Sequence, residues 1–144
     1  TVENSDLNDL LEFRSMLEAE TASYAAKRAT QEDIEKITIC YNHMIEYRND
    51  INSFVDYDSQ FHMLISDATH NKLLISTMIA AKDSFERCIR VAMRQSLTKN
   101  PRVIDVTIDL HGKILEAVKN RDYQTAYAIV REHISYVNLT VKYG

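Results

Sequence analysis

The near absence of glycine and proline is the feature that most constrains how this chain folds. The 144 residues include two glycines and one proline, whereas these two residue types together make up about 12% of an average protein. β-Sheets need many tight turns, and tight turns use glycine and proline for their special backbone angles. The scarcity therefore argues against a sandwich, a barrel or a Rossmann-type sheet, and it predicts an all-α chain with few, short connections.

Composition and charge narrow the class of protein further. Hydrophobic residues make up 45% of the chain and charged residues 26%, as in an ordinary soluble globular domain. No stretch approaches the ~20 apolar residues of a membrane-spanning helix, and no signal peptide opens the sequence. We expect no membrane contact, and the cytoplasm is the expected location because the two unpaired cysteines fit a reducing compartment. A net charge of −4 argues against a nucleic-acid-binding surface in this part of the protein. The two cysteines, Cys40 and Cys88, have no partner motif and fit buried, reduced thiols.

Apolar residues recur every three to four positions along the chain, which indicates helices. The expected helices cover residues 6–28, 31–48, 53–68, 72–97, 102–119 and 123–142. Thr30 with Asp33 forms a weak capping box, and Asn71 and Asp122 can serve as N-caps. Pro101 is expected at a helix start, where proline is tolerated. With no repeat or linker between them, these helices predict one antiparallel bundle.

Four polar residues interrupt the apolar faces that the helices should turn toward the core. Asp58 and His62 lie in the third expected helix, His111 in the fifth and His133 in the sixth. Asp58 and His62 are an i, i+4 pair, so their side chains meet on one helix face. A buried charge or an unpaired imidazole is costly in an apolar core. Each of the four side chains therefore needs a partner.

His111 and His133 are expected to face each other across the last helical hairpin. The turn at Asp122 lies midway between them in the sequence, which places both about 16 Å from the tip of the hairpin. If the third helix lies alongside, three imidazoles and one carboxylate gather in one place, a suitable set of ligands for a divalent transition metal. The alternative is a set of hydrogen-bonded core side chains without a metal.

Arg14 is a fifth polar residue on an apolar stripe, between Leu11 and Leu17 of the first expected helix. An inward guanidinium needs an anion, and its planar fork fits a carboxylate with two hydrogen bonds. The anion is either the carboxylate of a ligand or the side chain of Glu18, one helical turn further on. The spacing leaves both alternatives open.

Two further features of the helices could serve ligand binding. Arg87, Arg90 and Arg94 form a basic face on the fourth helix, which is either a solvated surface or a second contact to an anionic ligand. Gly112, next to His111, lowers helix stability by about 1 kcal/mol relative to alanine. This glycine would let a ligand or a neighbouring helix approach closely.

Several short motifs also occur in a fixed order along the chain. The first is LEFRSMLE at residues 11–18, followed by AAKRAT at 25–30, and the second is an Asp-x-x-Phe-His pattern at 58–62. The turn His70-Asn71 with Leu74 comes next, and a closing hairpin runs from His111 and ILEA at 114–117 to Arg131-Glu132-His133. Each motif is loose alone, but their order and spacing over residues 6–137 are specific. The pattern resembles the ligand-binding C-terminal domain, the FCD domain, of FadR-type GntR transcription regulators.

This resemblance implies a fold, a metal and a class of ligand. The family fold is an antiparallel bundle of six or seven helices, and residues 1–144 would be a single ligand-binding and dimerisation domain. Many members bind a divalent metal through one aspartate and three histidines, which correspond here to Asp58, His62, His111 and His133. Effectors in the family are usually small organic or sugar acids, whose carboxylate sits at the metal beside an arginine at the position of Arg14.

The resemblance also implies partners. The family joins this domain to an N-terminal winged helix-turn-helix domain, which is absent from this chain, so we expect a homodimer that binds DNA only through that missing domain. Zinc is the metal we expect, with nickel or manganese as alternatives.

Three functions are compatible with these residues. In the first and expected one, a small carboxylate effector binds at the metal and alters DNA binding by the winged-helix domain. In the second, the Asp/His3 site belongs to a metalloenzyme. Against this, no spare inward glutamate or histidine is expected nearby as a general base, because Glu116 and Glu132 point elsewhere on their helices. In the third, the metal is purely structural in a dimerisation module.

Overall fold

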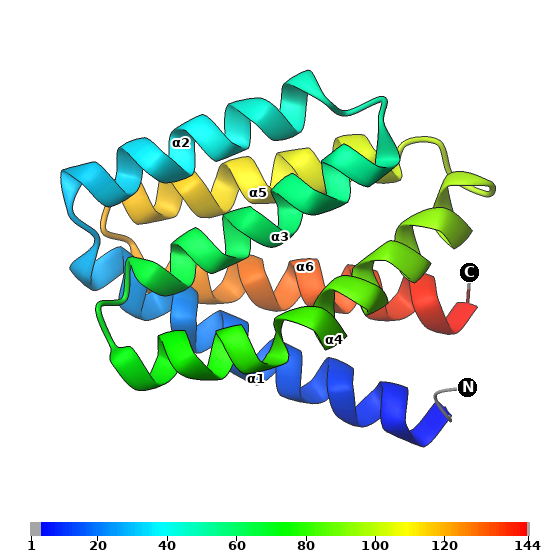
Figure 1. The fold of residues 1–144 in the computed structure, drawn as a ribbon, viewed down its shortest axis with the longest axis horizontal. Coiled ribbons are helices and arrows are strands. Elements are labelled where there is room, and N and C mark those ends of the chain that lie inside the picture. The colour runs from blue at the N-terminus through cyan, green and yellow to red at the C-terminus, as the bar shows by residue number, and fades with distance from the viewer. Residues whose placement is uncertain (1–3, 144) are drawn as a thin grey trace.

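Six α-helices joined by short turns make up the computed structural model, which describes the backbone of residues 4–143 and the side chains of residues 7–136 (Figure 1). The helices are α1 (Asn4–Arg28), α2 (Gln31–Glu46), α3 (Ile51–Asp67), α4 (Lys72–Leu97), α5 (Val103–Lys119) and α6 (Tyr123–Tyr143). No strand occurs between residues 4 and 143. The all-α class that the scarcity of glycine and proline predicted is therefore confirmed.

Side-chain caps set most helix starts. Thr30 and Asp33 form the predicted capping box, in which each side chain accepts the backbone N–H of the other. Asn71 caps α4 and the carboxylate of Asp122 accepts the N–H of Thr125 in the first turn of α6, both as expected. The start of α3 differs from the expectation.

Residues 48–50 were expected to form a loop before a helix beginning near Ser53. In the structure, Asp50 is instead the N-cap of α3, because its carboxylate accepts the backbone N–H groups of Asn52 and Ser53. The helix therefore begins two residues earlier, at Ile51. Aspartate is among the best N-cap residues, and this signal was present in the sequence.

The packing brings the two ends of the chain together around a shared core. Helix α1 contacts α6 more extensively than it contacts any other helix, and both termini lie at the same end of the bundle (Figure 1). Helices α5 and α6 form an antiparallel hairpin, and α3 packs against α1, α2 and α4. The inward faces of α1, α3, α5 and α6 thus line one interior. None of the described helices has both the length and the apolar character needed to cross a bilayer.

Both cysteines are buried and unpaired, as expected. Cys40 donates a hydrogen bond to the carbonyl oxygen of Tyr57 at 3.3 Å, and burial raises the pKa of its thiol to about 12. A thiol with so high a pKa carries almost no thiolate at neutral pH, so it is unreactive.

Gly112 allows α2 to approach α5 closely. A Cβ atom built at this position would lie 2.6 Å from the Tyr41 hydroxyl oxygen and 3.1 Å from its ring carbon Cζ. The Tyr41 hydroxyl donates a hydrogen bond to the carbonyl oxygen of Ile108 at 3.2 Å. The close approach that the glycine predicted is therefore made by a neighbouring helix.

Overpacking by the added methyl group costs about 1–3 kcal/mol, and alanine regains roughly 1 kcal/mol through its higher helix propensity. Because its hydrogen bond to Ile108 holds the Tyr41 hydroxyl in place, we expect the cost to be larger than the gain and Gly112→Ala to lower the free energy of unfolding by about 1–2 kcal/mol. Urea denaturation followed by circular dichroism measures the difference. In a Tyr41→Phe background the same substitution should cost less, since the hydroxyl nearest the new methyl group is gone. An alanine variant as stable as the parent would contradict this account.

Candidate metal centre

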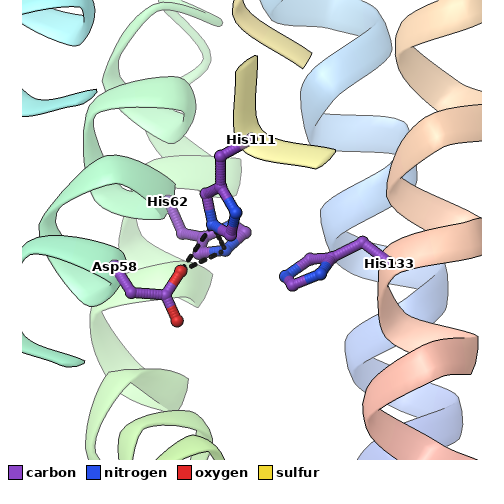
Figure 2. A group of neighbouring side chains, drawn as sticks. All are labelled: Asp58, His62, His111 and His133. Carbon is purple, nitrogen blue, oxygen red and sulfur yellow. Dashed lines mark hydrogen bonds and ion pairs between the residues drawn. The ribbon is translucent and has the colours of Figure 1, made fainter. Parts of the chain in front are cut away.

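Three helices bring four polar side chains together in the interior. Asp58 and His62 come from α3, His111 from α5 and His133 from α6, and one candidate ligand atom of each lies within 4.8 Å of the others. Each of the four residues is at most 7% exposed. Figure 2 shows Asp58, His62 and His111 close together, with His133 facing them from the opposite side. The structure therefore gathers all four residues that the sequence singled out.

The hairpin geometry explains how His111 and His133 meet. Their ring centroids lie 4.7 Å apart, and the Asp122 turn joins the two helices that carry them. Phe61, also on α3, packs the edge of its ring against His111 at 4.8 Å between centroids. The equal heights expected for the two histidines on α5 and α6 are thus confirmed.

Contacts at the outer ring nitrogens indicate the tautomers of two histidines. His111 Nδ1 lies 2.7 Å from the carbonyl oxygen of Thr107, which can only accept, so this nitrogen carries the proton. His62 Nδ1 forms an ion pair with a carboxylate oxygen of Glu18 at 3.1 Å, which favours a proton on this nitrogen as well. In the neutral imidazoles, each Nε2 then carries a lone pair.

These lone pairs converge on one point beside Asp58. The two Nε2 atoms lie 3.1 Å apart, and Asp58 Oδ1 lies 2.5 Å from that of His111 and 3.3 Å from that of His62. Despite these short distances, Asp58 Oδ1 makes no hydrogen bond with acceptable angles. The contact between the two Nε2 atoms is itself a hydrogen bond, so without a metal ion one of these nitrogens carries a proton. With both imidazoles neutral and protonated on Nδ1, the three electron pairs repel unless a metal ion lies between them.

Electrostatics favour charged Asp58 and neutral His133. Burial alone would raise the pKa of Asp58, but the imidazoles of His111 and His62 hold it well below its usual range. Burial and the nearby charges of His111, His62 and Arg14 lower the pKa of His133 well below its usual value. Burial would also lower the pKa of His62, but the carboxylates of Glu18 and Asp58 outweigh it and raise that pKa.

His133 has no hydrogen-bond partner for either ring nitrogen among the described residues. Its ring stacks almost parallel to that of His62, at an interplanar angle of 5°. Leaving a buried polar group unsatisfied costs about 1–3 kcal/mol. If His133 binds a metal, one of these nitrogens is used as the ligand atom. If it is an ordinary core histidine, it needs a hydrogen-bond donor or acceptor that the described residues do not supply.

The four residues fit a divalent ion. Metal–nitrogen and metal–oxygen bonds are about 2.0–2.2 Å long, so four ligands in a tetrahedral arrangement lie about 3.4 Å from one another. Around an ion, the widest spacing in the cluster, at most 4.8 Å, would shorten, and the 2.5 Å distance between Asp58 Oδ1 and His111 Nε2 would lengthen. Nitrogen-rich sets of this kind suit zinc, nickel and other first-row metals. The geometry is compatible with a metal and does not select one.

Glu18 is the part of the site that sequence reasoning missed. No spare inward glutamate was expected near the cluster as a general base, and Glu18, although inward at 4% exposed, is engaged by both Arg14 and His62. Glu116 and Glu132 are exposed, as expected. Glu18 was considered only as a partner for Arg14, because its contact with His62 depends on how α1 crosses α3. Local spacing carries no information about that crossing.

Arg14 is completely buried and only partly satisfied. Its Nε donates to Glu18 Oε2 at 2.6 Å, while Nη1 and Nη2 have no hydrogen-bond partner among the described residues. Its guanidinium carbon lies 5.9 Å from the centre of the Phe85 ring. The pair with Glu18 is therefore present, yet it leaves both terminal NH2 groups available to a second anion, so the two alternatives for Arg14 do not exclude each other.

The basic face on α4 makes no contact with the cluster. Arg90 is engaged by the carboxylates of Asp56 and Glu86 at 3.0 and 2.9 Å. Arg87 and Arg94 are exposed. The ion pairs of Arg90 and the exposure of the other two are typical of a solvated helix face.

The space beside the cluster is small. A hollow of about 10 Å³ lies next to Glu18 and His62, lined also by Met78, Phe85 and Ile89 of α4, and it has room for about one water molecule. Three larger hollows, of about 680, 430 and 450 Å³, are lined by none of the four cluster residues. The hollow beside His62 is therefore too small for an organic acid in this conformation.

Comparison with solved structures supports the fold assignment. The chain superposes on Escherichia coli McbR/YncC with a TM-score of 0.82 over 99% of this chain and 66% of that one, at 15% identity. It superposes on a GntR protein of Streptococcus agalactiae with a TM-score of 0.75 over 94% of this chain and 60% of that one, at 18% identity. At such low identity, these similarities show the fold alone.

Curated relatives are transcription regulators. A regulatory protein named for the L-lactate dehydrogenase operon of E. coli (strain K12) is 34% identical over 93% of this chain and 51% of its own length. The Glc operon transcriptional activator of the same strain is 31% identical over 89% of this chain and 52% of its own length. The chain thus spans about half the length of the curated relatives it matches. The FCD domain family model matches residues 9–136, and the chain belongs to this family, the FCD domains of FadR-type GntR transcription regulators.

Proposed function

We propose that this domain senses a small carboxylic acid through a divalent metal held by Asp58, His62, His111 and His133. The observation that carries the proposal is the convergence of one candidate ligand atom from each of four buried side chains to within 4.8 Å. Among the described residues, Asp58 Oδ1 and both ring nitrogens of His133 have no hydrogen-bond partner. Zinc is the proposed metal, with nickel or manganese as alternatives, because imidazole-rich sites bind all of them.

The class of effector follows from the relatives and from Arg14. Relatives are named for the L-lactate dehydrogenase operon and the galactonate operon, and lactate and galactonate are both hydroxy acids. A bound divalent ion supplies a Lewis-acidic position for one carboxylate oxygen. The two unpaired Nη atoms of Arg14 supply the matching hydrogen-bond donors. A small hydroxy acid or sugar acid is therefore the proposed ligand.

The proposed output is a change in helix packing. The four proposed metal ligands lie on α3, α5 and α6, and Arg14 lies on α1. An acid that contacts the metal and Arg14 at the same time therefore links all four helices. A shift among these helices would alter the placement of an N-terminal winged helix-turn-helix domain in the full-length regulator. We propose a homodimer acting on DNA in the cytoplasm through that domain.

A metalloenzyme is the second candidate, and Glu18 favours it as a buried carboxylate beside a candidate ligand. However, Glu18 already accepts from Arg14 Nε at 2.6 Å and faces His62 Nδ1 at 3.1 Å. A general base needs a free lone pair within reach of the substrate proton. Glu18 is thus better placed to hold its two neighbours than to take up a proton.

His133→Leu tests the metal. We expect the metal-free variant to be as stable as the parent or more stable, because two buried, unpartnered nitrogens are removed. Zinc should raise the melting temperature of the parent and not that of the variant, since binding to the folded state stabilises it by mass action. Melting curves after chelator treatment, with and without zinc, measure both effects, and elemental analysis gives the metal content.

The control for this experiment is His43→Leu. His43 packs against Tyr57 and is not part of the cluster, so this variant should keep the full response to zinc. An equal zinc response in His133→Leu, or a parent that neither contains metal nor responds to it, would refute the metal site.

L-Lactate and galactonate test sensing against catalysis. Each acid that binds should raise the melting temperature only of metal-loaded protein and should remain chemically unchanged after long incubation. Lactamide, which lacks the carboxylate, is the matched control and should have no effect. Steady conversion of an acid by the parent, lost in Asp58→Ala, would establish the metalloenzyme instead.

Arg14→Ala tests the carboxylate clamp. Charge-assisted hydrogen bonds are worth about 1.5–3 kcal/mol, so the variant should bind the effector roughly 10- to 100-fold more weakly while retaining its metal. Arg14→Lys should restore only part of the affinity, because lysine lacks the two-pronged geometry. Calorimetric titration measures the affinity, with the exposed Arg87→Ala as control. Unchanged affinity in Arg14→Ala would remove this residue from the site.

A further inference from the structure

The carboxylate of Glu18 lies between the candidate metal ligand His62 and the buried arginine. Oε1 lies 3.1 Å from His62 Nδ1, and Oε2 lies 2.6 Å from Arg14 Nε. Each oxygen thus serves a different partner. The side chain is almost fully buried, so no bulk water competes for these contacts.

The contact with His62 favours the tautomer in which the nitrogen that faces the cluster carries no proton. A carboxylate only accepts hydrogen bonds, so it keeps the proton on Nδ1 and leaves the lone pair on Nε2. Nε2 is the atom that lies 3.3 Å from Asp58 Oδ1 and 3.1 Å from His111 Nε2. With the other tautomer, an N–H group would point into the cluster and His62 would be unable to bind a metal there.

The contact with Arg14 decides which part of the guanidinium stays available. Glu18 engages Nε and none of the terminal nitrogens, so Nη1 and Nη2 are held together without a partner. The same carboxylate therefore orients the two groups that the proposed function assigns to the metal and to the effector.

We infer that Glu18 is a positioning residue that fixes His62 as a metal ligand and ties its orientation to that of Arg14. The inference rests on the proposed metal site and adds the residue that sets its affinity. Partners of metal-binding histidines orient the ring and increase its basicity, and their loss lowers metal affinity by about 10- to 100-fold. Arg14 restrains the carboxylate from the side opposite to His62.

Glu18→Gln keeps the shape of the side chain but can no longer satisfy both neighbours. Its amide oxygen can accept from His62 or from Arg14, and its NH2 group then meets an N–H donor on the other. We expect zinc affinity, measured by competition with a chromogenic chelator, to fall about 10- to 100-fold. The absorption spectrum of the Co²⁺-loaded protein should change as well, because the geometry around the metal is altered. Glu20→Gln, which removes the same charge from an exposed position of α1, should leave affinity and spectrum unchanged.

A second pair of variants separates positioning from folding. Glu18→Gln alone leaves Arg14 as a buried, unpaired cation, so the substitution is better compared in an Arg14→Ala background. In that background, glutamine is free to accept from His62 Nδ1, whereas Glu18→Leu offers no acceptor. The Arg14→Ala/Glu18→Gln protein should bind zinc nearly as tightly as Arg14→Ala, and Arg14→Ala/Glu18→Leu about 10- to 100-fold more weakly.

The outcomes distinguish this inference from the function on which it rests. A parent that binds neither Zn²⁺ nor Co²⁺ would overturn the proposed function together with this inference. A parent that binds zinc, with equal affinity in the glutamine and leucine variants of the Arg14→Ala background, would overturn the role of Glu18 alone. A large difference between those two variants, with similar melting temperatures when metal-free, would support it.

Discussion

The interior of this bundle depends on the negative charge of Asp58. A carboxylate in an apolar core is tolerated only when partners compensate for its lost hydration. The groups nearest to Asp58 are imidazoles from α3 and α5, which compensate its charge when they carry a proton or share a metal ion with it. Moving His111 by one residue along α5 would rotate its side chain by about 100° around the helix axis and leave the carboxylate without its nearest partner. The charge therefore specifies the register of α5 against α3 more strictly than apolar packing alone, which tolerates many substitutions of similar volume.

Local chemistry explains what could be predicted from the sequence. The helices followed from apolar periodicity, and caps such as Thr30 with Asp33 act within a single turn. The pair Asp58 and His62 and the facing of His111 and His133 also depend on one helix or one short hairpin. The approach of α3 to that hairpin is a tertiary contact. The sequence could only assume this contact, and the structure shows it. Glu18 was missed for the same reason, because its second contact joins α1 to α3.

The structure also separates two interpretations of inward histidines that the sequence left open. Core histidines are normally satisfied by hydrogen bonds to both ring nitrogens or to one of them, and His111 has such a bond through Nδ1 to Thr107. His133 has none on either side among the described residues, although it lies 4.7 Å from the ring of His111. A hydrogen-bonded core explains His111 but does not explain His133. Binding of one ion by both residues would account for the ring nitrogens of His111 and His133 that face the cluster.

The distribution of the donors over the helices has a consequence for how the domain could respond to a ligand. The four candidate ligands come from α3, α5 and α6, and α1 joins them through Glu18. Helix α4 supplies none of these groups, yet its Met78, Phe85 and Ile89 line the small hollow beside the cluster. An ion would hold the first set of helices together, and an acid entering beside His62 would have to displace side chains of α4. Such an acid would therefore alter the packing of α4 against α3, whereas the groups that would hold the ion come from other helices.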